Sequence, residues 1–235
     1  VIADRHGQGQ PRGGRDCSGH RRQQKGGEET PPVGLAKNIL LDIQDAAARL
    51  MQAAAYESAG TVEFIYDTAS GQFYFMEVNT RLQVEHPITE ELYNVDLVKA
   101  QIRVAMGHKL DKIEPPTGGC VIEVRLNAED ADKEFSPAPG KVSLCKPPSG
   151  PGIRFDSGFE EGNKIPGDFD SMIAKVIASG SSRNETLARL VRALEELEIK
   201  IEGGTTNRAF LLEFLRSSAM RQGGVHTRFL EEWLA

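Results

Sequence analysis

The sequence predicts an α+β fold in two domains, and three observations support this. Two segments rich in β-branched and aromatic residues, TVEFIYD from Thr61 and QFYFMEVN from Gln72, flank a short glycine-containing loop that is typical of a β-hairpin. Other segments carry apolar residues at the spacing of an amphipathic helix. Residues 111–119 contain two prolines and two glycines, which indicates a link between domains. We therefore expect one domain over residues 1–113 and a second over 114–235.

The helices and remaining strands are expected in the following order. A helix over residues 36–58 has five apolar residues on one face, and Gly60 follows as a stop signal: Ile39, Ile43, Ala47, Leu50 and Ala54. A second helix covers residues 96–106 and stops at Gly107. After the link, short strands are expected around Val121, Val142, Ile153 and Met172, followed by helices over residues 184–197, 207–216 and 227–233.

The first 35 residues are unlike the rest of the chain. Between Ala3 and Val33 the only apolar side chain apart from proline is Cys17, and eight of the 24 glycines precede Leu35. Such a composition cannot bury a core, so the residues by themselves predict a flexible, glycine-rich and degenerate segment.

Charge and composition exclude several classes of function. A net charge of −6 and a pI near 5.5 argue against a general nucleic-acid binder. The apolar runs are too short to cross a bilayer, and we expect no membrane partner. Three cysteines without metal-ligand spacing favour reduced thiols, which predicts a cytoplasmic protein.

The predicted hairpin places two acids opposite each other. A three-residue loop over residues 69–71 would pair Thr68 with Gln72, Phe64 with Met76 and Glu63 with Glu77. Opposed like charges destabilise a sheet, so a cation between the carboxylates would explain the pair. Asn79 would share their face, and two carboxylates with an amide oxygen are ligands that magnesium accepts beside nucleotide phosphates. The alternative is a solvated polar face without a ligand.

Five motifs in order resemble the biotin carboxylase family: GTVEF at Gly60, EVNTRLQVEHP at Glu77, EVRLNAED at Glu123, FSPAPGK at Phe135 and FDSMIAK at Phe169. The family comprises the ATP-grasp subunits or domains of acetyl-, propionyl- and methylcrotonyl-CoA carboxylases, pyruvate carboxylase and urea carboxylase. The resemblance implies the carboxy-terminal half of an ATP-grasp domain followed by the mixed α/β biotin carboxylase carboxy-terminal domain. The family's preceding region, with its phosphate-contacting lysines and glycine-rich lid, has no counterpart in the sequence. We therefore expect an amino-terminally truncated member that is inactive alone.

The resemblance also assigns roles along the hairpin and the segment after it. It implies that Glu63, Glu77 and Asn79 hold Mg²⁺ or Mn²⁺ against the ATP phosphates, and that both glutamates thereby contribute to ATP binding. Arg81, Gln83 and Val84 correspond to the residues that hold bicarbonate, through a guanidinium, an amide and a backbone N–H. Glu85 corresponds to the general base that removes the bicarbonate proton.

Further roles fall outside the hairpin. Arg125 lies in CVIEVRLN, whose alternation predicts a half-buried strand with Arg125 on the polar face. The pattern alone would also suit an ordinary surface arginine, whereas the resemblance implies a cation that stabilises the enolate-like oxygen of biotin. Lys25 matches a lysine near bicarbonate, carboxyphosphate and ATP. Gln23 and His20 occupy nucleotide-contacting positions where the family often has histidine and usually has glutamine, respectively.

The resemblance also gives another interpretation of the first 35 residues. The motifs VIADRHG, RDCS, RRQQK and EETPP are spaced as in a strand-rich stretch of the family that lies over the nucleotide. Glycines at positions 9, 14, 19, 26 and 27 stand where the family usually has larger residues, so the resemblance implies strands that lose packing at these glycines.

The function implied is that of an ATP-dependent ligase, which carboxylates carrier-bound biotin with bicarbonate through carboxyphosphate. The implied partners are a biotin carboxyl carrier domain, a carboxyltransferase and a second copy in a homodimer. Two alternatives stay open: another ATP-grasp ligase such as a carbamoyl phosphate synthetase, and an inactive remnant that serves only as an interface. The EVRLNAED and FDSMIAK motifs argue against the former. The sequence does not select an acyl-CoA, pyruvate or urea as the final acceptor.

Overall fold

The computed structural model describes residues 1–21, 24–168, 170–223, 225–226 and 229–233, without the side chains of residues 20, 21, 24–26 and 231. The chain forms two compact units. Unit 1 contains residues 1–15 and 30–117, and unit 2 contains residues 16–29 and 118–235. Both contain helices and strands, so the predicted mixed fold is confirmed.

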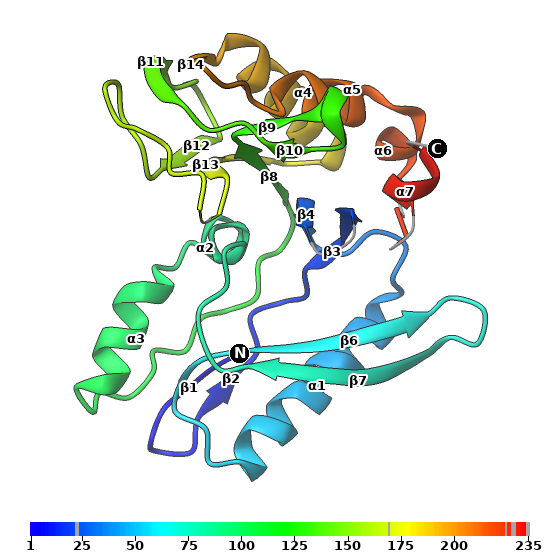
Figure 1. Ribbon diagram of the computed structural model, residues 1–235. Coiled ribbons are helices and arrows are strands. Elements are labelled where there is room, and N and C mark those ends of the chain that lie inside the picture. Colours follow the sequence, from blue (N-terminus) through cyan, green and yellow to red (C-terminus); the bar gives the residue numbers. More distant parts are fainter. Residues whose placement is uncertain (22–23, 169, 224, 227–228, 234–235) are drawn as a thin grey trace. The chain divides into compact units, whose positions relative to one another are not determined.

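Unit 1 combines a small antiparallel sheet, a long hairpin and three helices (Figure 1). The sheet has the order β2-β1-β5, and the hairpin is formed by β6 and β7. The bounds of the strands are β1 (Ile2–Ala3), β2 (Gly9–Gln10), β5 (Ser58–Ala59), β6 (Thr61–Asp67) and β7 (Gln72–Asn79). The helices are α1 (Lys37–Ala53), α2 (His86–Tyr93) and α3 (Leu97–Ala105).

Helix α1 ends earlier than the sequence predicts, and its buried face differs from the predicted one at its carboxy-terminal end. Ala55 has a positive φ of 48°, and the helix stops at Ala53 instead of reaching Ser58. The side chains it buries are those of Ala47 and Met51, whereas Leu50 is 37% exposed. The predicted face is confirmed at Ala47 and is wrong at its carboxy-terminal end, where Met51 is buried in place of Leu50 and Ala54.

The hairpin confirms the predicted opposition of Glu63 and Glu77 but not the predicted turn. Gln72 pairs with Asp67 instead of Thr68, and the backbone N–H of Gly71 donates to the carbonyl of Asp67 at 2.8 Å. Gly71 has a φ of 69°, which glycine adopts without steric cost. The loop is therefore one residue longer than expected.

A β-bulge in β7 compensates for the longer loop. Phe64 pairs with Phe75 instead of Met76, and the register shifts between Phe64 and Glu63. The extra residue restores the pairing of Glu63 with Glu77. It also places Phe73 on the face opposite Glu63, where its ring and that of Phe64 meet edge to face at 5.6 Å. Glu63 and Glu77, the predicted metal ligands, thus lie on the face of the hairpin opposite these aromatic rings.

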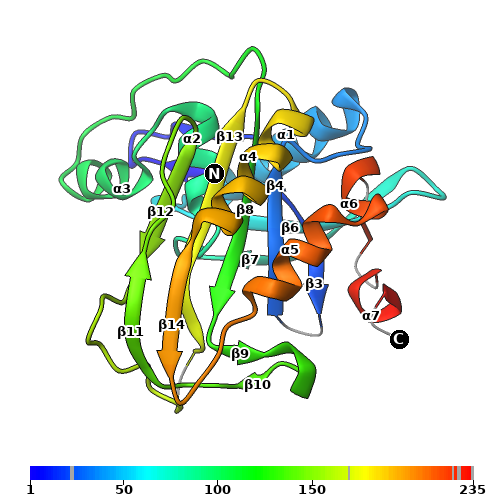
Figure 2. The ribbon, with the colours of Figure 1, turned by 90° about the horizontal axis from the view of Figure 1, so that it is seen from above.

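Unit 2 is built on a five-stranded sheet of order β12-β13-β8-β4-β3. Figure 2 shows α4 lying over strands β8 and β13 of this sheet, with α5 beside it on the same face, where it contacts β8. The sheet strands are β3 (Asp16–Arg21), β4 (Gln24–Thr30), β8 (Cys120–Asn127), β12 (Ile153–Ser157) and β13 (Met172–Gly180). The other elements are β9 (Glu129–Asp130), η1 (Ala131–Lys133), β10 (Ser136–Pro137), β11 (Lys141–Lys146), α4 (Arg183–Glu196), β14 (Glu198–Glu202), α5 (Arg208–Arg216), α6 (Ser218–Gln222) and α7 (Phe229–Trp233).

The core of unit 2 lies between this sheet and its helices. Alternate residues of β8 point into it, and their side chains are buried together with those of α4 and α5: Cys120, Ile122, Val124, Leu126, Leu187, Leu190, Leu194, Leu211 and Phe214. The predicted strands around Val121, Val142, Ile153 and Met172 are confirmed. Strand β14 and helix α6 were not predicted.

The flexible segment that composition alone predicts for the first 35 residues is wrong, because four strands occupy it, as the resemblance implies. Strands β3 and β4 add to the edge of a sheet whose core side chains come from residues beyond 118. Arg183 at the start of α4 holds β4 through an ion pair with Glu29, whose carboxylate accepts from its Nε at 2.7 Å. Burial raises the pKa of Glu29 and the arginine opposes that shift. Residues 16–29, whose only apolar side chain is that of Cys17, are ordered here by a sheet edge and ion pairs.

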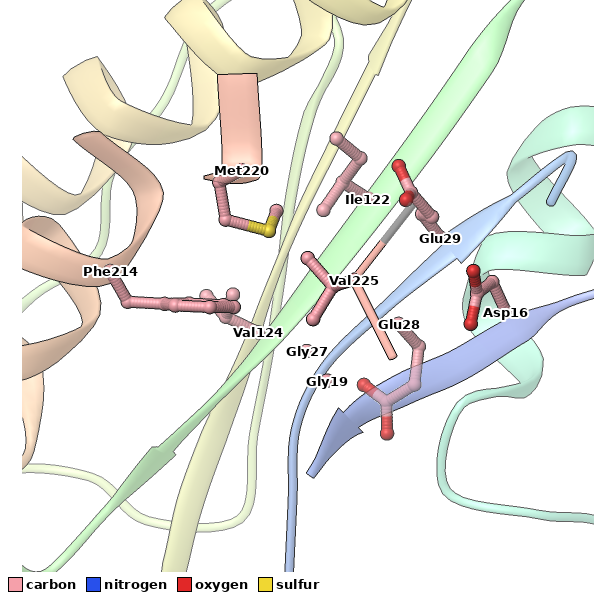
Figure 3. A pocket seen from close by; sticks show the side chains of 10 residues that line it. All are labelled: Asp16, Gly19, Gly27, Glu28, Glu29, Ile122, Val124, Phe214, Met220 and Val225. Carbon is pink, nitrogen blue, oxygen red and sulfur yellow. The ribbon is translucent and has the colours of Figure 1, made fainter. Parts of the chain in front are cut away.

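Glycines in β3 and β4 leave a small pocket against the core (Figure 3). Gly19 and Gly27 are paired across the strands, and Phe214, Met220 and Val225 line the opposite side. A Cβ at Gly27 would lie 3.4 Å from the nearest neighbour, the carbonyl oxygen of Glu123, which is ordinary contact. A Cβ at Gly19 would lie 3.0 Å from the carbonyl oxygen of Gly27. Gly27 therefore has room for a side-chain carbon that Gly19 lacks.

Replacing Gly27 by Ala is expected to stabilise the protein by about 0.5–1 kcal/mol, since alanine restricts the unfolded chain and fills part of the pocket. Urea unfolding measures this as a higher midpoint. Gly19→Ala, on the paired strand, is the matched control and should give no gain because its Cβ meets backbone. Equal midpoints for Gly27→Ala and the wild type would contradict the account of the pocket.

Candidate active site

The hairpin brings three predicted metal ligands together. Glu63 on β6 lies opposite Glu77 on β7, and Asn79 projects between them. The amide nitrogen of Asn79 donates to Oε1 of Glu63 at 3.0 Å and to Oε1 of Glu77 at 3.0 Å. One amide group therefore reaches both carboxylates.

The arrangement fits a divalent cation. Two opposed carboxylates repel each other, and the donors that now lie between them could be replaced by a metal ion once the Asn79 amide turns its oxygen inward. No three His, Cys, Asp or Glu side chains gather as a complete metal site within the described part of the chain. A cation held by Glu63, Glu77 and Asn79 would therefore take its remaining ligands from water or from a phosphate-bearing substrate.

The segment after β7 carries the residues predicted to hold bicarbonate. Arg81 is exposed, and its NH1 donates to the backbone oxygen of Leu82 at 3.3 Å. Gln83 is only 7% exposed, and Val84 is partly buried. The amide nitrogen of Gln83 donates to Oε1 of Glu63 at 2.8 Å. This hydrogen bond links a predicted bicarbonate residue directly to a predicted metal ligand.

Glu85 lies at the start of a helix that was not predicted. It is 2% exposed and is the N-cap residue of α2, where Pro87 occupies the first turn. Pro87 is a helix-start signal that the sequence analysis did not use. His86 fixes the turn before the helix, since its Nδ1 N–H donates to the backbone oxygen of Gln83 at 2.8 Å.

Arg15 is a neighbour of this site that the sequence analysis missed. Its NH2 group donates to Oε1 of Gln83 at 2.7 Å and to Oγ1 of Thr61 at 2.8 Å. Arg15 lies 68 residues before Gln83, inside the glycine-rich segment, and only the motif RDCS marked it. A continuous chain of hydrogen bonds therefore runs from Arg15 through Gln83 and Glu63 to Asn79.

Arg125 lies in unit 2, on the face of β8 opposite the core, as its alternation predicts. The half-buried strand that was predicted is wrong, however, because Val121 and Glu123 on the face of Arg125 are buried as well. Its NH2 donates to Oε1 of Glu28 at 2.6 Å, and the two side chains are 16% and 0% exposed. Asn207 holds the adjoining backbone, because its Nδ2 donates to the carbonyl of Arg125 at 3.0 Å. Neither Glu28 nor Asn207 was predicted to be part of the site.

The neighbouring strand adds a second cation to this face. Lys175 on β13 is the register partner of Arg125, and its ammonium lies 3.7 Å from a carboxylate oxygen of Asp156. Arg154 also binds Asp156, at 2.8–2.9 Å through two nitrogens. The face around Arg125 is thus a row of paired charges.

Three further predicted residues lie in β3, β4 and the connection between them. His20 lies on β3 and Lys25 on β4, but their side chains lie outside the described residues. Gln23 lies outside the described residues altogether.

Comparison with known families assigns both parts of the chain. Residues 1–113 match the family model of the carbamoyl-phosphate synthase L chain ATP-binding domain. Residues 123–232 match that of the biotin carboxylase C-terminal domain. The second match argues against a carbamoyl phosphate synthetase, which was the alternative ligase.

Curated relatives carry corresponding names. Biotin carboxylase 1 of Bacillus subtilis is 45% identical over 99% of this chain and 52% of its own length. The biotin-dependent acyl-coenzyme A carboxylase alpha3 subunit of Mycobacterium leprae is 47% identical over 99% of this chain and 40% of its own length. The chain thus spans about half the length, or less, of these relatives.

Solved structures agree with the sequence relatives. The biotin carboxylase domain dimer of Hydrogenobacter thermophilus 2-oxoglutarate carboxylase, solved with MgADP, ADP and bicarbonate, is 38% identical with a TM-score of 0.93. It matches 98% of this chain and 51% of that chain. The biotin carboxylase of Campylobacter jejuni, also with a TM-score of 0.93, is 36% identical over 99% of this chain and 51% of that chain.

No helix among the described residues is long and apolar enough to cross a membrane. The fold is that of the carboxy-terminal half of an ATP-grasp domain followed by the biotin carboxylase carboxy-terminal domain. The two family models, the relatives and the solved structures agree, and this chain belongs to the biotin carboxylase family.

Proposed function

We propose that the chain contributes the metal, bicarbonate and biotin residues of a biotin carboxylase, which uses ATP and bicarbonate to carboxylate biotin on a carrier domain. The observation that carries this proposal is the network in which Asn79 and Gln83 both bind Glu63, directly before Arg81–Glu85. This network joins a magnesium-like ligand set to residues suited to a planar oxyanion.

Each residue would have a distinct role. Glu63, Glu77 and Asn79 would hold Mg²⁺ or Mn²⁺, which when bound neutralises charge on the ATP phosphates. Arg81, Gln83 and the backbone N–H of Val84 would hold bicarbonate. Lys25, Gln23 and His20 would complete contacts to bicarbonate and nucleotide.

The chemistry would begin at Glu85. Its carboxylate would take the bicarbonate proton, and the bicarbonate oxygen would attack the γ-phosphorus of ATP to release ADP and form carboxyphosphate. Carboxyphosphate would break down to carbon dioxide and phosphate. Arg125 would then stabilise the negative oxygen of the biotin ureido group as its nitrogen attacks carbon dioxide.

The domain and partner assignments belong to the same proposal. Residues 1–113 would form the ATP-grasp part and residues 114–235 the carboxy-terminal domain. The partners would be a biotin carboxyl carrier domain and a carboxyltransferase, and the complete enzyme would be a homodimer, as is the 2-oxoglutarate carboxylase domain named above. The thiols of Cys120 and Cys145 suit a cytoplasmic location.

Calorimetry with MgATP tests the proposal against the remnant alternative. The 235-residue chain supplies metal ligands but only part of the relatives' length, so we expect weak binding that requires both Mg²⁺ and ATP. ADP without metal is the control and should give less heat. Absence of any heat from MgATP would favour a remnant that serves only as an interface.

Glu77→Gln is expected to weaken Mn²⁺ binding by about tenfold or more, because it removes one of two anionic ligands. Electron paramagnetic resonance of free Mn²⁺, with ATP present, measures the affinity. Glu57→Gln, an exposed acid in the same unit, is the control and should bind as the wild type does. Wild-type Mn²⁺ affinity in Glu77→Gln would remove Glu77 from the metal site.

A further inference from the structure

Arg15 contacts the proposed bicarbonate residue Gln83 from the side away from Glu63. The Gln83 amide lies between the two: its oxygen accepts from Arg15 at 2.7 Å, and its nitrogen donates to Glu63 at 2.8 Å. Gln83 is 93% buried, so water has little access to compete for either contact. Thr61, whose Oγ1 lies 2.8 Å from the same Arg15 nitrogen, anchors the guanidinium.

The hydrogen-bonding capacities of these groups fix which way the amide points. A guanidinium has only donors and a carboxylate only acceptors. The Gln83 oxygen must therefore face Arg15, and its NH₂ group must face Glu63. The reversed amide would place donors against donors on one side and oxygen against oxygen on the other, with the loss of two charge-assisted hydrogen bonds.

We propose that Arg15 is a positioning residue that holds the Gln83 amide with its NH₂ group toward the metal and bicarbonate site. This inference rests on the proposed function and extends it to a residue outside the hairpin and its following segment. The amide nitrogen carries two hydrogens, so one can serve Glu63 while the other donates to a bicarbonate oxygen. Without Arg15, the amide loses the partner that prevents its rotation.

The orientation is tested by nitrogen-15 NMR of the 235-residue chain. The side-chain NH₂ signals of Gln83, assigned by their loss in Gln83→Ala, should show one hydrogen protected from exchange in the wild type. Arg15→Met keeps a long side chain but removes the donors, and it should abolish that protection. Unchanged protection in Arg15→Met would show that Arg15 does not fix the amide and would overturn the inference.

The effect of Arg15 on bicarbonate binding is tested by titration of ¹³C-bicarbonate in the presence of Mg²⁺. Arg15→Met should weaken bicarbonate binding by about tenfold to a hundredfold, the range for a lost hydrogen bond to a charged group. Arg15→Lys, which keeps a cation and a donor, should recover part of the affinity. Arg5→Met removes an exposed arginine paired with Glu57 in the same unit and should bind as the wild type does.

The outcomes separate this inference from the function on which it rests. A wild-type chain that binds no bicarbonate would contradict the proposed function of the site. A wild-type chain that binds bicarbonate, together with an Arg15→Met variant that binds it equally well, would contradict the role of Arg15 alone. Circular dichroism of each variant confirms that lost binding does not reflect lost folding.

Discussion

Glu85→Gln is expected to reduce bicarbonate-dependent ATP cleavage by about a hundredfold to ten-thousandfold, the usual contribution of a general base. Glutamine keeps the size of the side chain at this buried position but cannot accept the bicarbonate proton. Because the chain spans about half of its relatives, the assay requires a chimera in which residues 1–235 replace the matching part of Bacillus subtilis biotin carboxylase 1. Release of ADP with and without bicarbonate measures the effect.

Two controls make the result specific. Nucleotide affinity should be unchanged in Glu85→Gln, because the proposed base does not contact ATP. Glu91→Gln changes an exposed acid on the same helix, α2, and should leave turnover intact. Undiminished turnover in Glu85→Gln would remove Glu85 from the role of base.

Glu28→Met is expected to lower the free energy of unfolding by about 3–5 kcal/mol, because it removes the buried carboxylate that pairs with the largely buried guanidinium of Arg125. Glu28 has no exposed side-chain surface and lies 2.6 Å from the Arg125 guanidinium. Urea unfolding of the 235-residue chain measures the change.

The double variant Glu28→Met with Arg125→Met separates charge from packing. It should recover much of the lost stability, since removing both charges of a buried pair is far less costly than removing one. Glu198→Met, which breaks the exposed pair with Lys146, should have a much smaller effect. A small loss in Glu28→Met itself would show that the Arg125–Glu28 contact adds little to the fold.

The hairpin illustrates what the sequence could predict. Its two strands and the opposition of Glu63 and Glu77 follow from local composition, and both are present. The longer turn and the bulge near Met76 were not predicted. Each shifts the strand register by one residue, in opposite directions, so Glu63 still pairs with Glu77. Bulges depend on contacts made by the finished sheet, which composition alone does not encode.

The partners of the site residues were harder to predict. Arg15 and Glu28 lie in a segment whose own composition predicts disorder, and they meet Gln83 and Arg125 across 68 and 97 residues of sequence. The family resemblance identified Gln83 and Arg125, which are predicted to contact substrates. It did not identify Arg15 and Glu28, which form hydrogen bonds with them. Helix α2 was missed because Pro87 was not used as a helix-start signal, although proline often occupies the first turn of a helix.

Transfer of ¹⁴C from bicarbonate to biotin is the most direct test of the central claim, that the hairpin and the segment after it form the metal and bicarbonate site of a biotin carboxylase. The chimera that carries residues 1–235 should produce labelled carboxybiotin only when ATP and Mg²⁺ are present, and Glu85→Gln should nearly abolish the label. A folded chimera that binds MgATP but transfers no label, or one whose labelling survives Glu85→Gln, would contradict the claim.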